Sequence, residues 1–299
     1  MRILNFGSLN LDYVYQVPHF LAPGETMAAS RVDVVPGGKG LNQSVALAKA
    51  GACVYHAGAI GEGGTMLTEL LKNNGVDISL IRRGNSIQGN AIIQVTPSGE
   101  NAILLCGGSN REITVSQVKE TMALFEAGDW LILQNEVSCL KEMVQEAGKR
   151  GMRIALNPSP FESHLLELDF SLIDWLFINE VEGEQMTGET EPEQILAALR
   201  QRYPKLCIVL TLGRNGSVCD TPKERIYQEI FPVHAVDTTA AGDTFSGYMI
   251  ASFVQGLPLK QCMERASAAS AICVTRPGAS VAIPSIDEVE QLLANMCRL

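Results

Sequence analysis

The segment Asp237-Thr-Thr-Ala-Ala-Gly-Asp243-Thr-Phe places three small residues directly before a helical pattern. Ala240, Ala241 and Gly242 carry no bulky side chain that would keep a ligand away from their N–H groups. The N-terminus of a helix binds anions because its first N–H groups have no partner within the helix and its dipole is positive there. Asp243 lies in the first turn, and two interpretations stay open: a helix cap, or a general base that takes a proton from a hydroxyl nucleophile beside an anion site.

Around this segment, short apolar runs alternate with amphipathic stretches. The runs are apolar at successive positions, as expected of parallel strands that are covered on both faces. They lie at 3–6, 130–134, 153–157, 175–179 and 207–211. The amphipathic stretches show helical spacing at Val118, Met122 and Phe125, at Leu140, Val144 and Ala147, at Phe245, Met249 and Phe253, and at Ile286, Val289 and Leu293. This alternation predicts an α/β fold with a doubly wound, mostly parallel sheet flanked by helices.

Two segments, 13–35 and 87–106, break the alternation. Both are strand-like, are punctuated by Pro and Gly, and lack a helical period. We interpret them as a small β-sheet appended to a single domain that spans 1–299. A flap over a site and an oligomer contact are the two uses that stay open for it.

Composition excludes several classes of protein. The 299 residues include 23 Lys+Arg and 33 Asp+Glu, a net charge of −10, which disfavours a nucleic-acid binder because such affinity comes mostly from basic residues. The sequence contains neither a bilayer-length apolar run nor a secretion signal, so we expect a cytoplasmic protein without a membrane partner. The histidines are scattered, which argues against a local zinc motif. Without a C-x-x-C pair, the cysteines are predicted to be reduced core thiols. They stand at 53, 106, 139, 207, 219, 262, 273 and 297.

Polar residues follow the carboxyl ends of the predicted strands, where ligands bind in open α/β sheets. These residues are Gly7-Ser8, Gln134-Asn135-Glu136, Asn157, Asn179 with Glu182, and Thr211-Leu212-Gly213. Together they predict a polar cleft, although a turn or cap role is the alternative at any one position. Asn179 and Glu182 offer oxygen atoms that suit Mg²⁺ in combination with water and phosphates. A capping box is the competing interpretation of this pair.

The glycine-rich segment 36–43 (P-G-G-K-G-L-N-Q) allows its backbone to approach a ligand closely. It is not a Walker A loop, because Lys39 is followed by Gly. Lys39 and Asn42 can donate hydrogen bonds to sugar hydroxyls. Asn10 and Asp12 offer donors and acceptors suited to vicinal hydroxyls, with an Asx turn as the alternative.

Taken together, these motifs resemble the ribokinase-like carbohydrate kinases of the phosphofructokinase-B type. The resemblance covers nearly the whole chain, its motifs occur in the order of the family, and 237–245 is the most specific of them. It implies an ATP-dependent kinase that transfers the γ-phosphoryl group of Mg-ATP to a primary sugar hydroxyl. The glycine-rich segment favours D-ribose, which would yield D-ribose 5-phosphate. The alternatives are a kinase for a ketohexose, deoxyribose or pseudouridine, and a non-catalytic sugar- or nucleotide-binding protein on this fold. An NAD-linked Rossmann enzyme is disfavoured because no G-x-G-x-x-G follows the first strand.

The resemblance also implies roles for individual residues. Asp243 would be the general base, and the anion hole would be formed at Ala240, Ala241 and Gly242. The sugar would be held by Asn10, Asp12, Gly38, Lys39, Asn42, Glu136 and Asp243. The nucleotide would be bordered by Asn179, Thr211, Gly213 and Gly216. Glu182 would bind Mg²⁺ through water, and a monovalent cation, K⁺, would be held by Asp237, Thr239, Val274 and Gly278. The segments 13–35 and 87–106 would form a lid that also makes a homodimer contact. Four departures from the family pattern keep the identity of the sugar open. They are Leu41, the stretch 106–110, the shortened region 61–66, and the tail 278–282, which lacks a serine that ribokinases often have in the cation loop.

Overall fold

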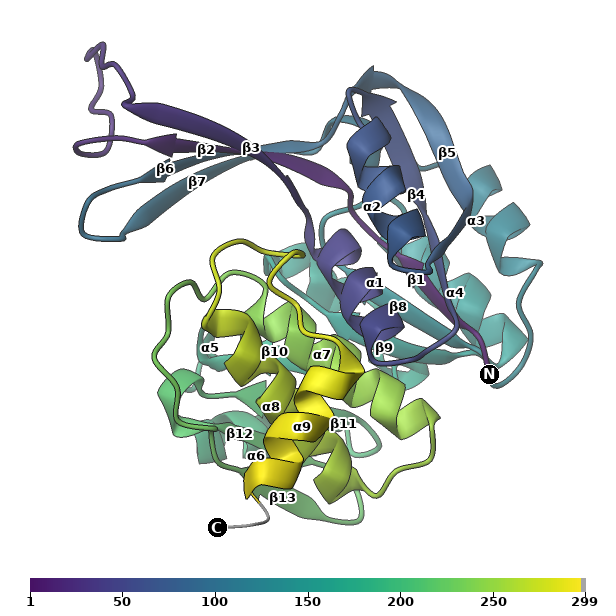
Figure 1. Cartoon of the computed structure of the whole chain (residues 1–299). Helices are drawn as coiled ribbons and strands as arrows, with labels where there is room; N and C mark the ends of the chain where they lie inside the picture. The colour runs from purple at the N-terminus through teal and green to yellow at the C-terminus, as the bar shows by residue number, and fades with distance from the viewer. Residues whose placement is uncertain (297–299) are drawn as a thin grey trace.

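The computed structural model describes residues 1–296, which form a large sheet between two layers of helices and a separate small sheet (Figure 1). The large sheet has nine strands in the order β13-β12-β11-β10-β9-β8-β1-β4-β5. Its strands are β1 (Ile3–Phe6), β4 (Val54–Glu62), β5 (Asp77–Ile87), β8 (Trp130–Gln134), β9 (Arg153–Asn157), β10 (Trp175–Asn179), β11 (Cys207–Thr211), β12 (Ser217–Asp220) and β13 (Arg225–Gln228). Strand pairing is parallel from β5 to β11, whereas β12 and β13 add an antiparallel edge. The predicted doubly wound, mostly parallel sheet is confirmed.

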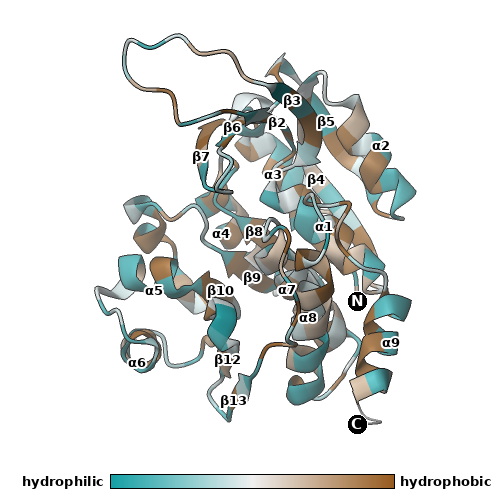
Figure 2. Cartoon of the chain, turned by 60° about the vertical axis from the view of Figure 1, so that its left-hand side comes forward, coloured by the Kyte–Doolittle hydropathy of each residue, from teal (hydrophilic) through white to brown (hydrophobic). Residues whose placement is uncertain are grey.

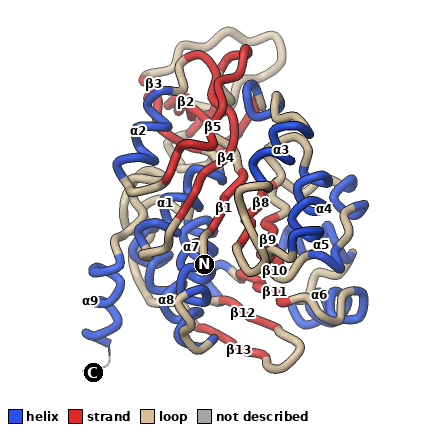
Figure 3. The backbone as a smooth tube through the Cα atoms, turned by 90° about the vertical axis from the view of Figure 1, so that its right-hand side faces the viewer, coloured by secondary structure: helices blue, strands red, loops and turns tan. Residues whose placement is uncertain are grey.

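Helices cover both faces of this sheet, as the view along its edge shows (Figure 3). One face carries α1 (Lys39–Lys49), α2 (Thr65–Asn73), α7 (Ala241–Val254), α8 (Leu259–Val274) and α9 (Ile286–Met296). The other carries α3 (Val115–Met122), α4 (Leu140–Arg150), α5 (Glu180–Thr187) and α6 (Pro192–Arg202). Successive side chains of a strand point to opposite faces, so Ile3 packs in one hydrophobic cluster and Leu4 in the other. This two-sided burial explains why the central strands read as continuous apolar runs.

One predicted helix is shorter than its apolar spacing indicates. The pattern that starts at Val118 extends to Phe125, but α3 ends at Met122. The N–H groups of Leu124 and Phe125 bond to carbonyls three residues back, which tightens the chain into a turn. Phe125 is still buried, where its ring meets Tyr55 edge-on at 5.6 Å between centroids.

The small sheet projects from the main body (Figure 1). Its strands are β2 (Asn10–Gln16), β3 (Arg31–Gly37), β6 (Asn90–Val95) and β7 (Asn101–Cys106), in the order β3-β2-β6-β7. Most of these residues come from 13–35 and 87–106, although the first two strands reach back to Asn10 and on to Gly37. Strand β7 is exposed along its length, including Ile103, Leu104 and Leu105. Much of this strand has the brown colour of hydrophobic residues in Figure 2. That this sheet is a lid and a homodimer contact within a single domain stays a prediction.

The cysteines that the structure describes are free thiols, but they do not all lie in the core. Cys219, Cys262 and Cys273 are buried as predicted, and Cys139 and Cys207 are partly buried. The prediction is wrong for Cys53 and Cys106, which are exposed because one stands in the turn before β4 and the other ends the uncovered strand β7. Cys297 lies outside the described residues. Between residues 1 and 296, none of the helices combines the length and the apolarity that a membrane span requires.

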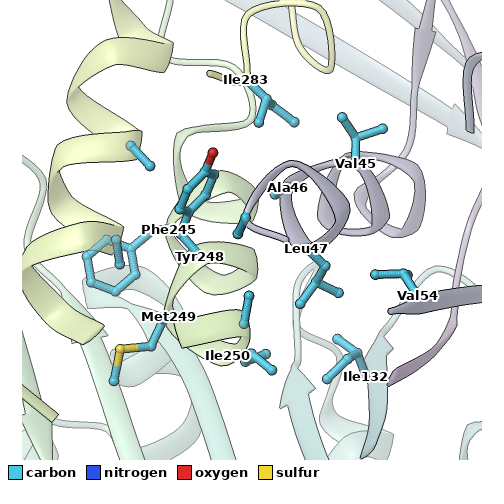
Figure 4. Packing of buried hydrophobic residues seen from close by; sticks show 14 of the residues in the cluster. Val45, Ala46, Leu47, Val54, Ile132, Phe245, Tyr248, Met249, Ile250 and Ile283 are labelled. Carbon is cyan, nitrogen blue, oxygen red and sulfur yellow. The ribbon is translucent and has the colours of Figure 1, made fainter. Parts of the chain in front are cut away.

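The packing of α1 against α7 brings together residues that are about two hundred positions apart (Figure 4). Gly247 on α7 faces Ala46 and Leu47 on α1 so closely that an added methyl group would overlap the side chain of Ala46. Tyr248 is buried beside this contact and donates its hydroxyl to the carbonyl of Pro284 at 2.8 Å. The two helices therefore approach each other at a distance that only a glycine allows.

We expect Gly247→Ala to destabilise the protein by about 1–3 kcal/mol, because overpacking outweighs the better helix propensity of alanine. Gly242→Ala in the same helix is the matched control, since a methyl group there meets no atom within 4 Å. Urea unfolding of both variants measures the difference. Equal stability of the two variants would contradict the packing argument.

Candidate active site

The site lies where the order of the strands in the sheet reverses. From β1, the chain continues to β4 and β5 on one side and later to β8 on the other. Ligands bind in open α/β sheets at such a switch point, outside the carboxyl ends of the strands. A cleft of about 220 Å³ opens at this end of the sheet. Its lining includes Lys39, Asn157, Asn179, Glu182, Thr211 and Asp243.

The N-terminus of α7 forms one wall of the cleft, through Ala240, Ala241 and Gly242. Ala240 precedes the helix with φ of 61°, a left-handed backbone that is strained for a residue with a side chain. Gly242 has no positive φ, and a methyl group added to it would enter open space. Packing within the protein therefore does not require a glycine at position 242. A ligand that lies close to the backbone would require one.

Asp243 is 6% exposed, and both of its carboxylate oxygens accept hydrogen bonds from α1. Asn42 Nδ2 donates to Oδ2 and Gln43 Nε2 donates to Oδ1, each at 3.0 Å. Because the carboxylate is bonded to another helix, it does not cap its own, which removes the cap interpretation. It is left as a buried acceptor that faces the cleft, as a general base requires.

Lys39 supplies positive charge to the same cleft. Burial alone would lower its pKa, but the carboxylates of Asp243, Glu136 and Glu182 outweigh burial and raise the pKa above its ordinary value. The ammonium group therefore stays charged at neutral pH.

The other predicted sugar-binding residues gather at the base of the small sheet. Asn10 Oδ1 accepts from Asn110 Nδ2 at 2.8 Å. Glu136 accepts from the hydroxyl of Ser8 and from the N–H of Lys39. Gly38 begins α1 with φ of 94°, a conformation that favours glycine.

Two acidic side chains at this base are protonated more easily than usual. Burial and the charge of Glu136 raise the pKa of Asp12 to about 7. Burial likewise raises the pKa of Glu136, against the opposing effect of Lys39. Because Asp12 titrates near neutral pH, its charge depends on what binds beside it.

Asn179 and Glu182 form the capping box that competed with the metal interpretation. Asn179 Oδ1 accepts from the N–H of Glu182 at 2.9 Å, and Glu182 Oε2 accepts from the N–H of Asn179 at 3.0 Å. Both residues nevertheless line the cleft. Over the described residues, no group of three or more His, Cys, Asp or Glu side chains could hold a metal by itself.

The four residues predicted to hold a monovalent cation are brought together. Asp237 Oδ1 accepts from the N–H and hydroxyl of Thr239, and its Oδ2 accepts from the N–H of Gly278 at 2.9 Å. The carbonyl of Val274 accepts from the N–H of Asp237 at 3.2 Å. These contacts bring together carboxylate, hydroxyl and carbonyl oxygens from two segments, the loop before α7 and the end of α8 with the turn after it.

Some predicted residues lie away from the cleft lining. Gly213 begins a short 3₁₀ turn, η4 (Gly213–Asn215), and Gly216 ends it with φ of 87°. Neither of these two glycines lines the cleft, although Thr211 at the end of β11 does.

Sequence reasoning missed the residues that orient this site. No role was predicted for Gln43, although a polar side chain on the apolar side of a helix was a usable signal. Gln134 was noted only as a strand end. The stretch 106–110 was noted only as a departure beside the sugar site, and the contact of Asn110 with Asn10 depends on the fold. Leu41 is completely buried in the core and is not among the residues that line the cleft.

A buried carboxylate beside the open N-terminus of a helix, at the switch point of a doubly wound sheet, defines an enzyme that transfers an anionic group to a hydroxyl. The comparisons with known proteins agree. The sequence profile described as pfkB family carbohydrate kinase matches residues 2–286. A ribokinase of Haemophilus influenzae is 35% identical over 96% of both chains. The chain belongs to the pfkB family of carbohydrate kinases, so its reaction is phosphoryl transfer from ATP to a sugar.

Solved structures support the same assignment. A ribokinase from Thermotoga maritima matches with a TM-score of 0.87 and 32% identity, over 98% of this chain and 99% of that one. An Arabidopsis thaliana ribokinase complexed with ribose and ATP matches with a TM-score of 0.85 and 29% identity, over 98% of both chains.

Asp12 makes the stability of the ligand-free protein depend on pH. Its folded pKa of about 7 lies above its ordinary value of 3.8, so its contribution to stability is full below about pH 4 and is lost as the pH rises through 7. Asp12→Asn has no such dependence. We expect the melting temperature of the variant, relative to wild type, to rise between about pH 5 and about pH 8. A gap that stays constant over this range, measured by thermal unfolding, would contradict the assignment.

Proposed function

We propose that the protein is a ribokinase, which transfers the γ-phosphoryl group of Mg-ATP to the 5-hydroxyl of D-ribose and yields D-ribose 5-phosphate and ADP. One observation carries the proposal. The buried carboxylate of Asp243 faces a cleft whose wall is a helix N-terminus with an open space at Gly242. The full-length similarity to ribokinases supports the choice of sugar.

Asp243 takes the proton from the sugar hydroxyl as that oxygen attacks phosphorus. The N–H groups at Ala240, Ala241 and Gly242 stabilise the negative charge of the phosphoryl group in flight. Lys39 adds a fixed positive charge in the same cleft. Phosphoryl transfer depends mainly on positioning and on charge stabilisation, and these residues supply both.

The sugar occupies the space between the cleft and the small sheet. Asn10, Asp12 and Glu136 accept or donate hydrogen bonds to its hydroxyls, with Lys39 and Asn42 at the end nearest the base. Gly38 allows the backbone to come close. The burial of Leu41 in the core supports an unaltered ribose pocket.

The nucleotide lies along the ends of β10 and β11, bordered by Asn179, Thr211, Gly213 and Gly216. Glu182 uses one oxygen in its capping box, which fits a metal held mostly through water and phosphates. When bound, Mg²⁺ neutralises charge on the phosphates.

A monovalent cation, K⁺, is held by Asp237, Thr239, Val274 and Gly278. The chemistry of these donors fits the cation, because carboxylate, hydroxyl and carbonyl oxygens are hard ligands. Arg276, in the turn after α8, is paired with Glu288 and so leaves the charge of Asp237 available. The contacts of Asp237 with Val274 and Gly278 tie this turn to the segment that leads into α7 and the proposed anion hole.

The function is tested by ADP release with Mg-ATP and K⁺ on D-ribose, 2-deoxyribose, fructose, tagatose, adenosine and pseudouridine, each against a blank without sugar. We expect turnover chiefly on D-ribose. Asp243→Asn should lower kcat at least about 100-fold, because the general base is lost, while ATP still binds. Stronger turnover on another substrate would overturn the choice of sugar, and near-normal turnover by Asp243→Asn would remove the base from the mechanism.

Replacing K⁺ with Na⁺ should lower kcat, because the smaller ion fits the loop around Asp237 less well. Asp237→Ala should remove most of the difference between the two salts. Activity assays at constant ionic strength measure both effects. Equal rates of the wild type in the two salts would contradict the cation site.

A further inference from the structure

A chain of polar side chains runs from Asp243 into the core beneath the cleft. Its members lie on α1, β8, β1 and β4, and each is at most 1% exposed. They are Gln43, Gln134, Asn5, Ser44 and His56. Polar groups in such a core cost stability unless they are hydrogen-bonded, and well-packed apolar residues would serve folding as well. We therefore infer that these buried polar side chains serve the candidate active site above them.

Each amide of the chain fixes the orientation of the next. Asn5 Nδ2 donates to the carbonyl of Gly40 and to Ser44 Oγ, both at 2.8 Å, so its Oδ1 must face Gln134. Gln134 Nε2 donates to Asn5 Oδ1 at 3.0 Å and to Gln43 Oε1 at 2.7 Å. With its oxygen bound in this way, Gln43 must present its N–H to Asp243. The carbonyl of Gly40 thus sets the orientation of Asn5 and, through Gln134, that of Gln43. As a result, Gln43 turns its Nε2 rather than its Oε1 toward the carboxylate of Asp243.

The far end of the chain is electrically neutral. Ser44 Oγ lies 2.8 Å from His56 Nδ1. Burial lowers the pKa of His56 to about 4, so the imidazole carries no charge at neutral pH. The chain therefore ends on a neutral ring and brings no competing charge toward Asp243.

The two donors on Asp243 differ in how firmly they are held. Gln43 is anchored from below by Gln134. Asn42 has no such anchor, because its Oδ1 is buried without a hydrogen-bond partner in the described part of the chain. Asn42 is also among the residues proposed to bind the sugar, so it can exchange its bond to Oδ2 for one to a hydroxyl.

We propose that Gln134 and Asn5 are positioning residues for the general base: they lock Gln43 onto Oδ1 of Asp243 and so leave Oδ2, which Asn42 releases, as the oxygen that takes the proton. In this step the sugar O–H bond breaks and its proton forms a bond to Oδ2, while the electron pair of the sugar oxygen forms a bond to the γ-phosphorus of ATP. The bond from that phosphorus to the bridging oxygen breaks, and ADP leaves with its electron pair. The inference rests on the proposed function, since it assigns roles within the same reaction.

The test compares Gln134→Met, Gln43→Met and the double variant with wild type on the sugar that the panel identifies. Methionine keeps the length of glutamine but donates no hydrogen bond. We expect Gln134→Met to lower kcat roughly 10- to 100-fold, because the base is misplaced, while KM for sugar and ATP stays within about twofold. The double variant should be no slower than Gln43→Met alone, since Gln134 acts only through Gln43.

The pH profile gives a readout that a purely structural role would not move. A carboxylate that loses a donor holds its proton more tightly, so the acidic limb of kcat should move to higher pH in both single variants. The charged and titratable groups around Asp243 are Lys39 on α1, Glu136 after β8, Glu182 on α5 and Cys273 on α8. The variants leave all of these groups in place.

Gln117→Met is the matched control. Gln117 on α3 is 3% exposed and donates to the carbonyl of Gly58 at 2.9 Å, under the opposite face of the sheet. Gln117→Met should lower the melting temperature without changing kcat or the acidic limb of its pH profile.

Two results with an active wild type would overturn the positioning proposal alone. One is a kcat of Gln134→Met within twofold of the wild-type kcat. The other is a double variant whose loss of kcat equals the sum of the losses, in free energy, of the two single variants. If Gln134→Met does not fold, an unmoved acidic limb in Gln43→Met overturns it. A wild type that phosphorylates no sugar overturns the proposed function as well.

Discussion

The close contact between α1 and α7 is the constraint on which the site depends. Gly247 allows the two helices to approach until Ala46 fills the space where a side chain would be. Only at this distance can Asn42 and Gln43 reach the carboxylate of Asp243. The glycine-rich loop before α1 and the small residues before α7 therefore contribute to one site, although they are far apart in the sequence. Packing, rather than the loops themselves, fixes the position of Asp243, the proposed base.

The electrostatics of the cleft follow from that geometry. Lys39 is the basic residue among the side chains that line it, whereas Asp243 and Glu182 line it as carboxylates and Glu136 lies close behind. A nucleoside triphosphate brings further negative charge into this space. The single positive charge of Lys39 does not balance the negative charges of these carboxylates and of the triphosphate. The nucleotide is therefore expected to enter together with cations. This need explains how a chain with a net charge of −10 can act on an anionic substrate.

Periodicity predicted five of the nine strands of the large sheet, because strands buried on both faces leave an unbroken apolar run. It did not predict β4, whose run is interrupted by His56 and Gly58, nor β5, β12 and β13. It also failed where local geometry decides the outcome, as at the end of α3, where two tight turn bonds replace helical ones. Motifs likewise predicted several of the residues that line the cleft, such as Asn157, Asn179 and Thr211, but not all of the predicted strand-end residues line it. Motifs did not predict the support beneath the cleft. Gln134 and Asn110 act through partners on other elements, and only the folded chain shows which amide oxygen is already occupied.

The four strands of the small sheet meet the body at one end of the sheet. The row Pro36, Leu11, Asn90 and Cys106 crosses all four strands there, and the pair of Asn10 with Gly37 lies next to it, nearer the site. Asn10 is itself in the proposed sugar site, and Gly37 directly precedes the glycine that begins α1. A change in the angle of the small sheet would therefore move Asn10 and Gly37. If the proposed sugar site is correct, such a change would alter the affinity for the sugar while leaving the carboxylate of Asp243 in place.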